Sequence, residues 1–220
     1  MHNRQDNAQE IEIHSVDAPV ARLILAHGAG AGMQHEFMQH MAQLLNKFSI
    51  EVVLFNFPYM QTIVATGKRR PPNKAEQLLA HFSSVIHQVT QQKASKPLPT
   101  FVGGKSMGGR MATMLLDNEE SILGAVVFGY PFHPPGKPDK LRTGHLATLK
   151  KPTLIVQGER DTFGTQQEVS DYTLSSAVTL AFLPDGDHSF KPRKKSGYSL
   201  RAHCEQAAKL AADFMRDTAE

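Results

Sequence analysis

The feature that most constrains the fold of this 220-residue chain is the sequence G-K-S-M-G at residues 104–108. A short apolar run precedes it at 100–103, and residues 107–118 carry apolar side chains at helical spacing. In this setting G-x-S-x-G predicts a sharp turn from a strand into a helix, which directs the hydroxyl of Ser106 into a cleft. Glycines flank the serine because Cβ atoms would clash in so tight a turn. The start of the helix would also direct free N–H groups towards that hydroxyl.

Composition is typical of one globular domain, which we expect to span residues 1–220 with the polar residues 1–10 frayed. Hydrophobic residues make up 40% of the chain and charged residues 20%, which argues against a disordered protein. No apolar run reaches the roughly 18 residues that a membrane span needs, and the start lacks the apolar core of a secretory signal. The single cysteine cannot form an internal disulfide, which favours a cytoplasmic location.

Charge and histidine patterns point away from nucleic acids and metals. The net charge is only +3, and the basic run at residues 191–195 has no interleaved aromatic side chains, so we interpret it as a solvated surface. The chain has eleven histidines but no C-x-x-C or H-E-x-x-H sequence. We therefore expect no metal and no other cofactor.

Predicted strands and helices alternate along the chain. Short apolar runs predict buried parallel strands at 21–26, 52–55, 100–103, 123–128, 153–156 and 178–183, and residues 11–14 alternate as an edge strand does. Apolar side chains at intervals of three and four predict helices within 37–48, 75–89, 107–118, 165–173 and 200–214. Residues 58–72 lack a period and are predicted as a loop, and so are 130–150 apart from one turn near 145–149. The alternation predicts a doubly wound, mostly parallel sheet with helices on both faces.

Three candidate functional side chains follow predicted strands. Ligands of open α/β sheets bind beyond the carboxyl ends of the strands, and Ser106, Asp161 and His188 each lie in a loop that leaves such an end. A serine hydroxyl is a poor nucleophile unless a base takes its proton, and an imidazole with a pKa of about 6.5 suits that task. A carboxylate would orient the ring. The chain order Ser, Asp, His is the order of an α/β-hydrolase triad.

Each of these assignments has an ordinary alternative. His188 could be a surface-loop histidine, and Asp161 could cap the helix that begins nearby. Other carboxylates compete with Asp161 for the role beside the imidazole, namely Asp185, Asp187 and Glu159. The two that are close to His188 in sequence would point poorly at its ring, so we favour Asp161.

Together these motifs identify a resemblance to a known family. The chain resembles an α/β-hydrolase of the small, lidless, dienelactone-hydrolase-like group, and more closely the KANL/Tex type. The resemblance covers nearly the whole sequence and rests on HGAGAG at 27–32, FPY…GKRRPP within 57–72, GKSMGG at 104–109, YPFHPPGKP at 130–138, QGERD at 157–161 and GDHSF at 186–190. It implies an α/β-hydrolase fold without a cap domain. It also implies an oxyanion hole made by the backbone N–H groups of Met107 and Ala29, with Gly30 close behind.

The loops around the site suggest what kind of substrate could enter. Pro152 follows Phe128 by 24 residues, which is too short for a cap domain, so we expect an open site that suits short acyl groups. Arg69 and Arg70 are candidates to bind an anionic substrate, although a solvated charged loop is the more ordinary interpretation. Tyr59 and Phe132 are candidates to line the pocket, and either could equally belong to the core.

Two functions from different classes follow. The first is a serine hydrolase that cleaves a small-molecule ester, thioester or related carbonyl substrate through an acyl-enzyme. The second is a non-catalytic binding or scaffold protein on the same fold, because fold does not determine function. The KANL/Tex resemblance makes the second possibility serious, since one relative of that type is a subunit of a chromatin-modifying complex.

Overall fold

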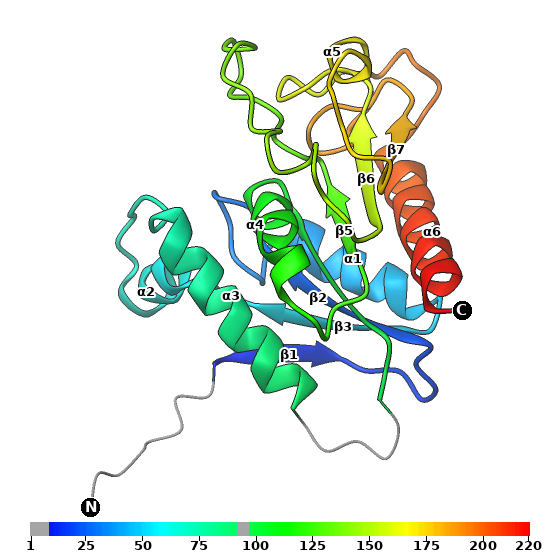
Figure 1. Ribbon diagram of the computed structural model, residues 1–220. Coiled ribbons are helices and arrows are strands. Elements are labelled where there is room, and N and C mark those ends of the chain that lie inside the picture. The colour runs from blue at the N-terminus through cyan, green and yellow to red at the C-terminus, as the bar shows by residue number, and fades with distance from the viewer. Residues whose placement is uncertain (1–8, 92–96) are drawn as a thin grey trace, which may run out of the picture.

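A computed structural model describes residues 9–91 and 97–220 (Figure 1). The expected fraying of residues 1–10 therefore falls mostly outside the described residues. Within them lies a seven-stranded sheet in the order β1-β3-β2-β4-β5-β6-β7. Its strands are β1 (Ile11–His14), β2 (Ala21–Ala26), β3 (Ile50–Phe55), β4 (Thr100–Lys105), β5 (Ala125–Phe128), β6 (Thr153–Gly158) and β7 (Val178–Leu183). Only the pairing of β1 with β3 is antiparallel, so the predicted edge strand and mostly parallel sheet are confirmed.

Helices cover both faces of the sheet (Figure 1). They are α1 (Glu36–Asn46), α2 (Pro58–Thr66), α3 (Ala75–Thr90), α4 (Met107–Leu115), α5 (Gln166–Ser170) and α6 (Leu200–Ala219), with a 3-10 turn at Leu116–Asn118. Successive strand residues point to opposite faces. In β2, Ile24 packs in the core beneath α3 and α4, whereas Leu23 and Leu25 pack in the core beneath α1 and α6. This burial on both faces explains why the parallel strands are continuous apolar runs rather than alternating ones.

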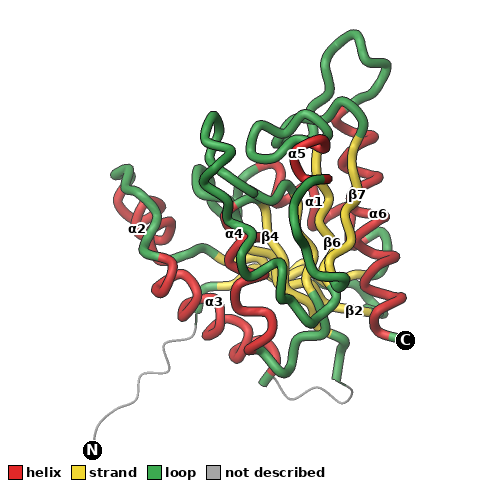
Figure 2. The backbone as a smooth tube through the Cα atoms, turned by 45° about the horizontal axis from the view of Figure 1, so that its top comes forward, coloured by secondary structure: helices red, strands yellow, loops and turns green. Residues whose placement is uncertain are grey.

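The strand register brings the carboxyl ends of the parallel strands to one edge. Ala26 pairs with Gly104, Lys105 pairs with Phe128, and Gly158 pairs with Leu183. Figure 2, in which the top of Figure 1 comes forward, shows mostly loops over this edge. The residues between β5 and β6 run there without forming a helix or strand, so the described chain has no cap domain. The turn expected near 145–149 is closed by a hydrogen bond from Thr148 N to His145 O (3.2 Å).

The prediction that residues 58–72 form a loop is wrong in its first half. Helix α2 begins with Pro58 in its first turn and ends at Thr66, and the next residue, Gly67, has a left-handed φ of 67° that suits glycine. Only two of its side chains, Tyr59 and Met60, are buried, so the apolar period that reveals a helix is missing. The signals that could have revealed it were the proline at the first helical position and the glycine just after the end. The predicted helix at 165–173 is also shorter, and Leu123 is exposed ahead of β5.

Candidate functional site

Ser106 occupies a strained turn between β4 and α4. Its backbone has φ 52° and ψ −115°, a conformation that residues with a side chain rarely adopt. A Cβ atom added at Gly104 would lie 2.3 Å from Gly108 C, and one added at Gly108 would lie 2.4 Å from Ala26 O. Glycine is therefore required at both positions by the close approach of α4 to the ends of β4 and β2. The strand-turn-helix setting predicted for the serine is present.

His188 reaches Ser106 from the loop after β7. Its Nε2 lies 2.9 Å from Ser106 Oγ, and its Nδ1 lies 2.7 Å from Asp161 Oδ2. The ring packs on Phe163 with 4.2 Å between centroids, and its side chain is 23% exposed. Residues that are far apart in sequence thus form one hydrogen-bonded chain from hydroxyl to imidazole to carboxylate.

Asp161 is completely buried and fully hydrogen-bonded in the loop after β6. Its Oδ1 accepts the backbone N–H of Phe163 (2.8 Å), while its Oδ2 accepts Gln157 Nε2 (2.8 Å) as well as the imidazole. Gln157 in turn accepts Tyr130 N–H at 2.7 Å. Sequence reasoning missed Gln157, although an amide inside the apolar run of β6 is the kind of signal that marks a buried polar network.

The carboxylates that competed with Asp161 have other partners. Asp185 pairs with Arg160 and Arg193, and the hydrogen bond from Arg193 lowers the pKa of Asp185 to about 2. Asp187 accepts the backbone N–H groups of Ser189 and Lys191 within its own loop. Glu159 accepts Asp185 N–H at 2.7 Å. Of the described carboxylates, Asp161 is the one hydrogen-bonded to His188.

The loop after β2 lies against the serine. A Cβ atom at Gly28 would be 3.7 Å from Ser106 Cβ. Within the described chain, the backbone N–H groups of Ala29, Gly30 and Met107 have no protein acceptor, which leaves them available to a ligand oxygen. These are the groups that the family resemblance implies for an oxyanion hole.

The buried side chains of His27 and Tyr59 support the loop after β2. His27 Nδ1 lies 2.7 Å from Gly28 O, and its Nε2 accepts Phe57 N–H at 3.1 Å. Burial lowers the pKa of His27 to about 4, so the ring is neutral at physiological pH. The Tyr59 hydroxyl donates to Ala29 O at 2.9 Å, and its ring is buried. The expectation that Tyr59 lines the pocket is therefore corrected: this side chain supports the loop from the interior.

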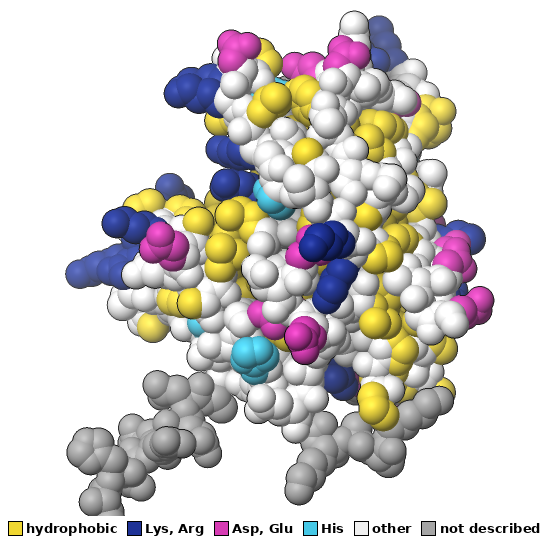
Figure 3. Space-filling model, in the orientation of Figure 1, with side chains coloured by type: hydrophobic (Ala, Val, Ile, Leu, Met, Phe, Trp, Pro, Cys, Tyr) yellow, Lys and Arg dark blue, Asp and Glu magenta, His cyan; other side chains and the backbone are white. Residues whose placement is uncertain are grey.

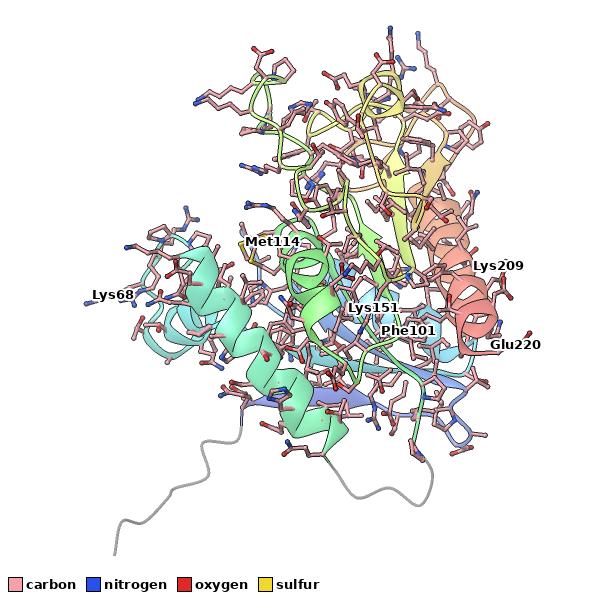
Figure 4. All side chains as sticks on the ribbon, viewed as in Figure 1. Lys68, Phe101, Met114, Lys151, Lys209 and Glu220 are labelled. Carbon is pink, nitrogen blue, oxygen red and sulfur yellow. The ribbon has the colours of Figure 1, made fainter. Side chains whose placement is uncertain are left out.

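The other expected substrate-binding residues lie away from the cleft. Phe132 is fully buried against Tyr130 and Tyr172, so it belongs to the core and does not line the cleft. Arg69 and Arg70 are exposed in the segment after α2, and neither lines the described cleft. Figure 3 shows Lys and Arg side chains at the surface of this flank, and Figure 4 shows the labelled Lys68 extending away from the molecule. The solvated-loop interpretation fits these positions better than an anion clamp.

A cleft of about 930 Å³ opens beside Ser106 and His188. Its apolar wall includes Phe37, Met38, Phe163, Leu200 and Cys204, and its polar lining includes His35, Glu36, His40 and Arg201. The amino ends of α1 and α6 supply most of these residues. These residues were not predicted, because the candidate residues came from the loops that follow strands. The amino ends of α1 and α6 lie beside the site because both helices pack on the same face of the sheet.

Lys105 is a second residue that the sequence analysis did not single out. It lines the cleft, and its Nζ donates to the backbone carbonyl of His188 at 2.6 Å. Among the described residues no group of three or more His, Cys, Asp or Glu side chains could hold a metal ion. In the same part of the chain, no helix has the length and hydropathy to cross a membrane.

Comparison with known proteins places this geometry in context. A family model described as an alpha/beta hydrolase domain matches residues 19–216. Dienelactone hydrolase from Anabaena variabilis superposes with a TM-score of 0.69 at 19% identity, over 93% of this chain and 89% of that one. An alpha-beta serine hydrolase homologue from Coxiella burnetii gives 0.69 at 15% identity, over 92% and 89%. An esterase from Pyrococcus furiosus gives 0.66 at 16% identity, over 90% and 82%. At these identities the likeness to solved structures concerns the fold.

Proposed function

The chain belongs to the alpha/beta hydrolase domain family, and from this premise we propose that it is a serine hydrolase acting on small esters, thioesters or related carbonyl compounds. The observation that carries the proposal is the hydrogen-bonded chain Ser106–His188–Asp161, with distances of 2.9 and 2.7 Å and a buried carboxylate at its end. A surface-loop histidine or a helix-capping aspartate would need neither contact.

In the first half of the proposed reaction, Ser106 Oγ attacks the substrate carbonyl carbon. His188 Nε2 takes the hydroxyl proton as the C–O bond forms, and the buried carboxylate of Asp161 stabilises the imidazolium that results. The tetrahedral intermediate then collapses: its bond to the alcohol or thiol breaks, and the imidazolium gives its proton to the leaving group. The products are a free alcohol or thiol and an acyl-Ser106 ester.

In the second half, water replaces the leaving group. His188 takes a proton from a water molecule as the water oxygen attacks the acyl carbon. It gives that proton to Ser106 Oγ when the ester bond breaks. The free N–H groups of Met107 and Ala29, with Gly30 next to them, would stabilise the negative oxygen in both halves. Each donor of this type is worth about 10²–10³ in kcat.

The cleft favours small acyl groups with an apolar body. Its apolar side chains suit a hydrocarbon group, and the missing cap leaves a long chain without a cover against water. We therefore propose a small substrate, and leave open whether the leaving group is an alcohol or a thiol.

A fluorophosphonate probe tests the proposal directly, because it reacts with an activated serine hydroxyl. We expect the intact protein to be labelled at Ser106 alone, as read by peptide mass spectrometry, and Ser106→Ala to lose both labelling and turnover of p-nitrophenyl acetate. Ser84→Ala is the matched control, since Ser84 is an exposed residue of α3 whose hydroxyl donates only to Ala80 O. A folded protein without labelling or turnover would instead favour the binding or scaffold function.

A further inference from the structure

Lys105 places an amine between the strand that carries the serine and the loop that carries the imidazole. Its Nζ donates to His188 O at 2.6 Å and lies 5.7 Å and 5.9 Å from the ring centroids of Phe37 and Phe190. A Cβ atom at Gly129 would come within 2.8 Å of the amine, so the glycine leaves the room that the lysine occupies. The side chain is thus half-buried against aromatic rings and backbone at the edge of the cleft.

The surroundings of this amine lack a paired carboxylate in the part of the chain that the structure describes. Within the described residues no Asp or Glu oxygen lies within the 4.0 Å of an ion pair with Lys105. Burial lowers the pKa of Lys105 to about 8, and the charges of Asp161 and Asp187 act in the opposite direction. An amine that is partly removed from water without a counter-ion is less favourable for folding than an exposed one. The contacts of the ammonium with Phe37 and Phe190 offset part of this cost, so stability alone is a weak reason for a lysine here.

The contact is placed where it can control the imidazole. Lys105 precedes Ser106 directly in the chain, and the carbonyl that it holds belongs to His188 itself. The contact with Asp161 orients the ring of His188, whereas Lys105 binds the backbone carbonyl of the same residue. Reaction rates are sensitive to such placement, since a shift of about 1 Å in a reacting group can cost a hundredfold.

We propose that Lys105 is a positioning residue, whose ammonium group holds the backbone carbonyl of His188 so that the imidazole stays in hydrogen-bonding reach of Ser106. The inference rests on the proposed hydrolase function for its effect on rate. The contact itself can be tested without turnover.

A consequence for pH follows from the charge on the amine. A charge-assisted hydrogen bond is about twice as strong as a neutral one, so the hold on His188 weakens as the ammonium loses its proton. The other titratable groups that face the same cleft are His35, Glu36 and His40 at the amino end of α1, Arg201 and Cys204 on α6, and His188. The charges of Asp161 and Asp187 also act on the amine. Burial raises the pKa of Cys204 to about 11, so that thiol stays protonated at the pH values near 8 where Lys105 titrates.

The first experiment compares Lys105→Met with Lys151→Met. Lys151 is a matched control because its Nζ, like that of Lys105, donates to backbone carbonyl groups. Its partners are Glu119 O at 2.6 Å and Ile122 O at 2.7 Å. It lies ahead of β6, near the amino ends of the strands, where Figure 4 labels it beside Phe101 of β4. We expect Lys105→Met to lower kcat/KM and the rate of fluorophosphonate labelling by about tenfold to a hundredfold. Lys151→Met is expected to change both by less than about twofold.

The pH profile separates positioning from a general loss of structure. In the wild type we expect kcat/KM to decline on the alkaline side with a midpoint near the pKa of Lys105, at about 8. Lys105→Met should be low and flat through this range. Lys105→Arg keeps a charged donor, so it should recover part of the rate and lack the alkaline decline. Wild-type activity and an unchanged profile in Lys105→Met would overturn the inference.

A measurement without substrate keeps the test independent of the proposed function. Histidine labelled with ¹³C at the carbonyl gives one signal for each of the eleven histidines, and loss of one signal in His188→Gln assigns residue 188. We expect that signal to shift with a midpoint near pH 8 in the wild type and in Lys151→Met, but to stay constant in Lys105→Met. No titration in the wild type would refute the contact. A titrating protein that lacks all labelling and turnover would refute only the hydrolase function.

Discussion

At the scale of single residues, the environment of Asp161 decides what its carboxylate can do. Three donors converge on its two oxygens, and one of them is the imidazole of His188. An amide in its place would keep the size of the side chain but could no longer accept all three. The neutral amide also could not stabilise the imidazolium by charge, and where its single nitrogen faces the His188 Nδ1–H it favours the wrong tautomer of the ring.

We therefore predict that Asp161→Asn folds but loses activity. By analogy with the same change in other triads, kcat should fall by about 10³–10⁴. The measurement is hydrolysis of p-nitrophenyl acetate alongside a circular dichroism spectrum that stays native. Asp185→Asn is the control, because Asp185 pairs with arginines and not with His188. A comparable loss in both variants would contradict the role given to Asp161.

The sequence located the candidate residues better than it located their directions. The G-x-S-x-G turn and the loops after β6 and β7 were sufficient to select Ser106, Asp161 and His188. Tyr59, by contrast, follows a strand end as expected but points inward to Ala29 O. The position of a side chain along the chain can be read from the sequence, but its direction depends on the local backbone conformation. Because helix α2 was not predicted, the direction of Tyr59 could not be predicted either. Gln157 and Lys105 were missed because their partners Tyr130 and His188 lie in loops after other strands, far away in the sequence.

At the scale of elements, the strands and the longer helices were predictable because each buries an apolar face. The runs in β2 and β3 are buried on both sides, and α3 repeats apolar residues along its length. Helix α2 was not predictable in this way, since few of its side chains are buried. Element prediction therefore worked where burial creates a period and failed where local capping residues define the helix.

The turn at Ser106 gives a prediction about an element junction. Gly104→Ala would place a Cβ atom 2.3 Å from Gly108 C, so β4 and α4 would have to separate. We expect a loss of about 2–3 kcal/mol in the free energy of unfolding, measured by urea denaturation. Gly144→Ala serves as the control, because a Cβ there meets nothing within 4 Å and its φ is not positive. Equal stability of the two variants would show that the junction can yield without cost.

At the scale of the whole molecule, burial of a neutral histidine links stability to acid. His27 has a folded pKa of about 4 against an ordinary value of 6.5, so between these pH values the unfolded chain binds more protons than the folded one. Stability must then fall as the pH is lowered through that window. Protonation also removes the lone pair on Nε2 that accepts Phe57 N–H.

We predict that the free energy of unfolding decreases by up to about 3 kcal/mol from this group as the pH falls from 6.5 to 4. His27→Gln should lack this part of the slope. His87→Gln, at a side chain that is 60% exposed, should keep it. Chemical denaturation at several pH values is the measurement, and parallel slopes for His27→Gln and the wild type would refute the assignment.

The open cleft gives a prediction about acyl length. Its wall comes from α1 and α6 rather than from a cap domain, so a long acyl chain would leave much of its surface in water. We expect kcat/KM for p-nitrophenyl acetate and butyrate to exceed that for decanoate, measured below the solubility limit of each ester. A preference for decanoate would mean that a cover forms over the cleft when substrate binds.

The placement of the three proposed catalytic groups also bears on how the protein fails. Ser106 follows β4 in the middle of the sheet, but His188 follows β7, an edge strand that pairs with β6 alone among the described strands. Strands at a margin fray before those at the centre, because they have neighbours on one side only. We therefore expect heat or denaturant to abolish the proposed activity while most of the core is still folded. The loss of activity would then follow the fraying of this edge of the sheet and precede the midpoint of global unfolding.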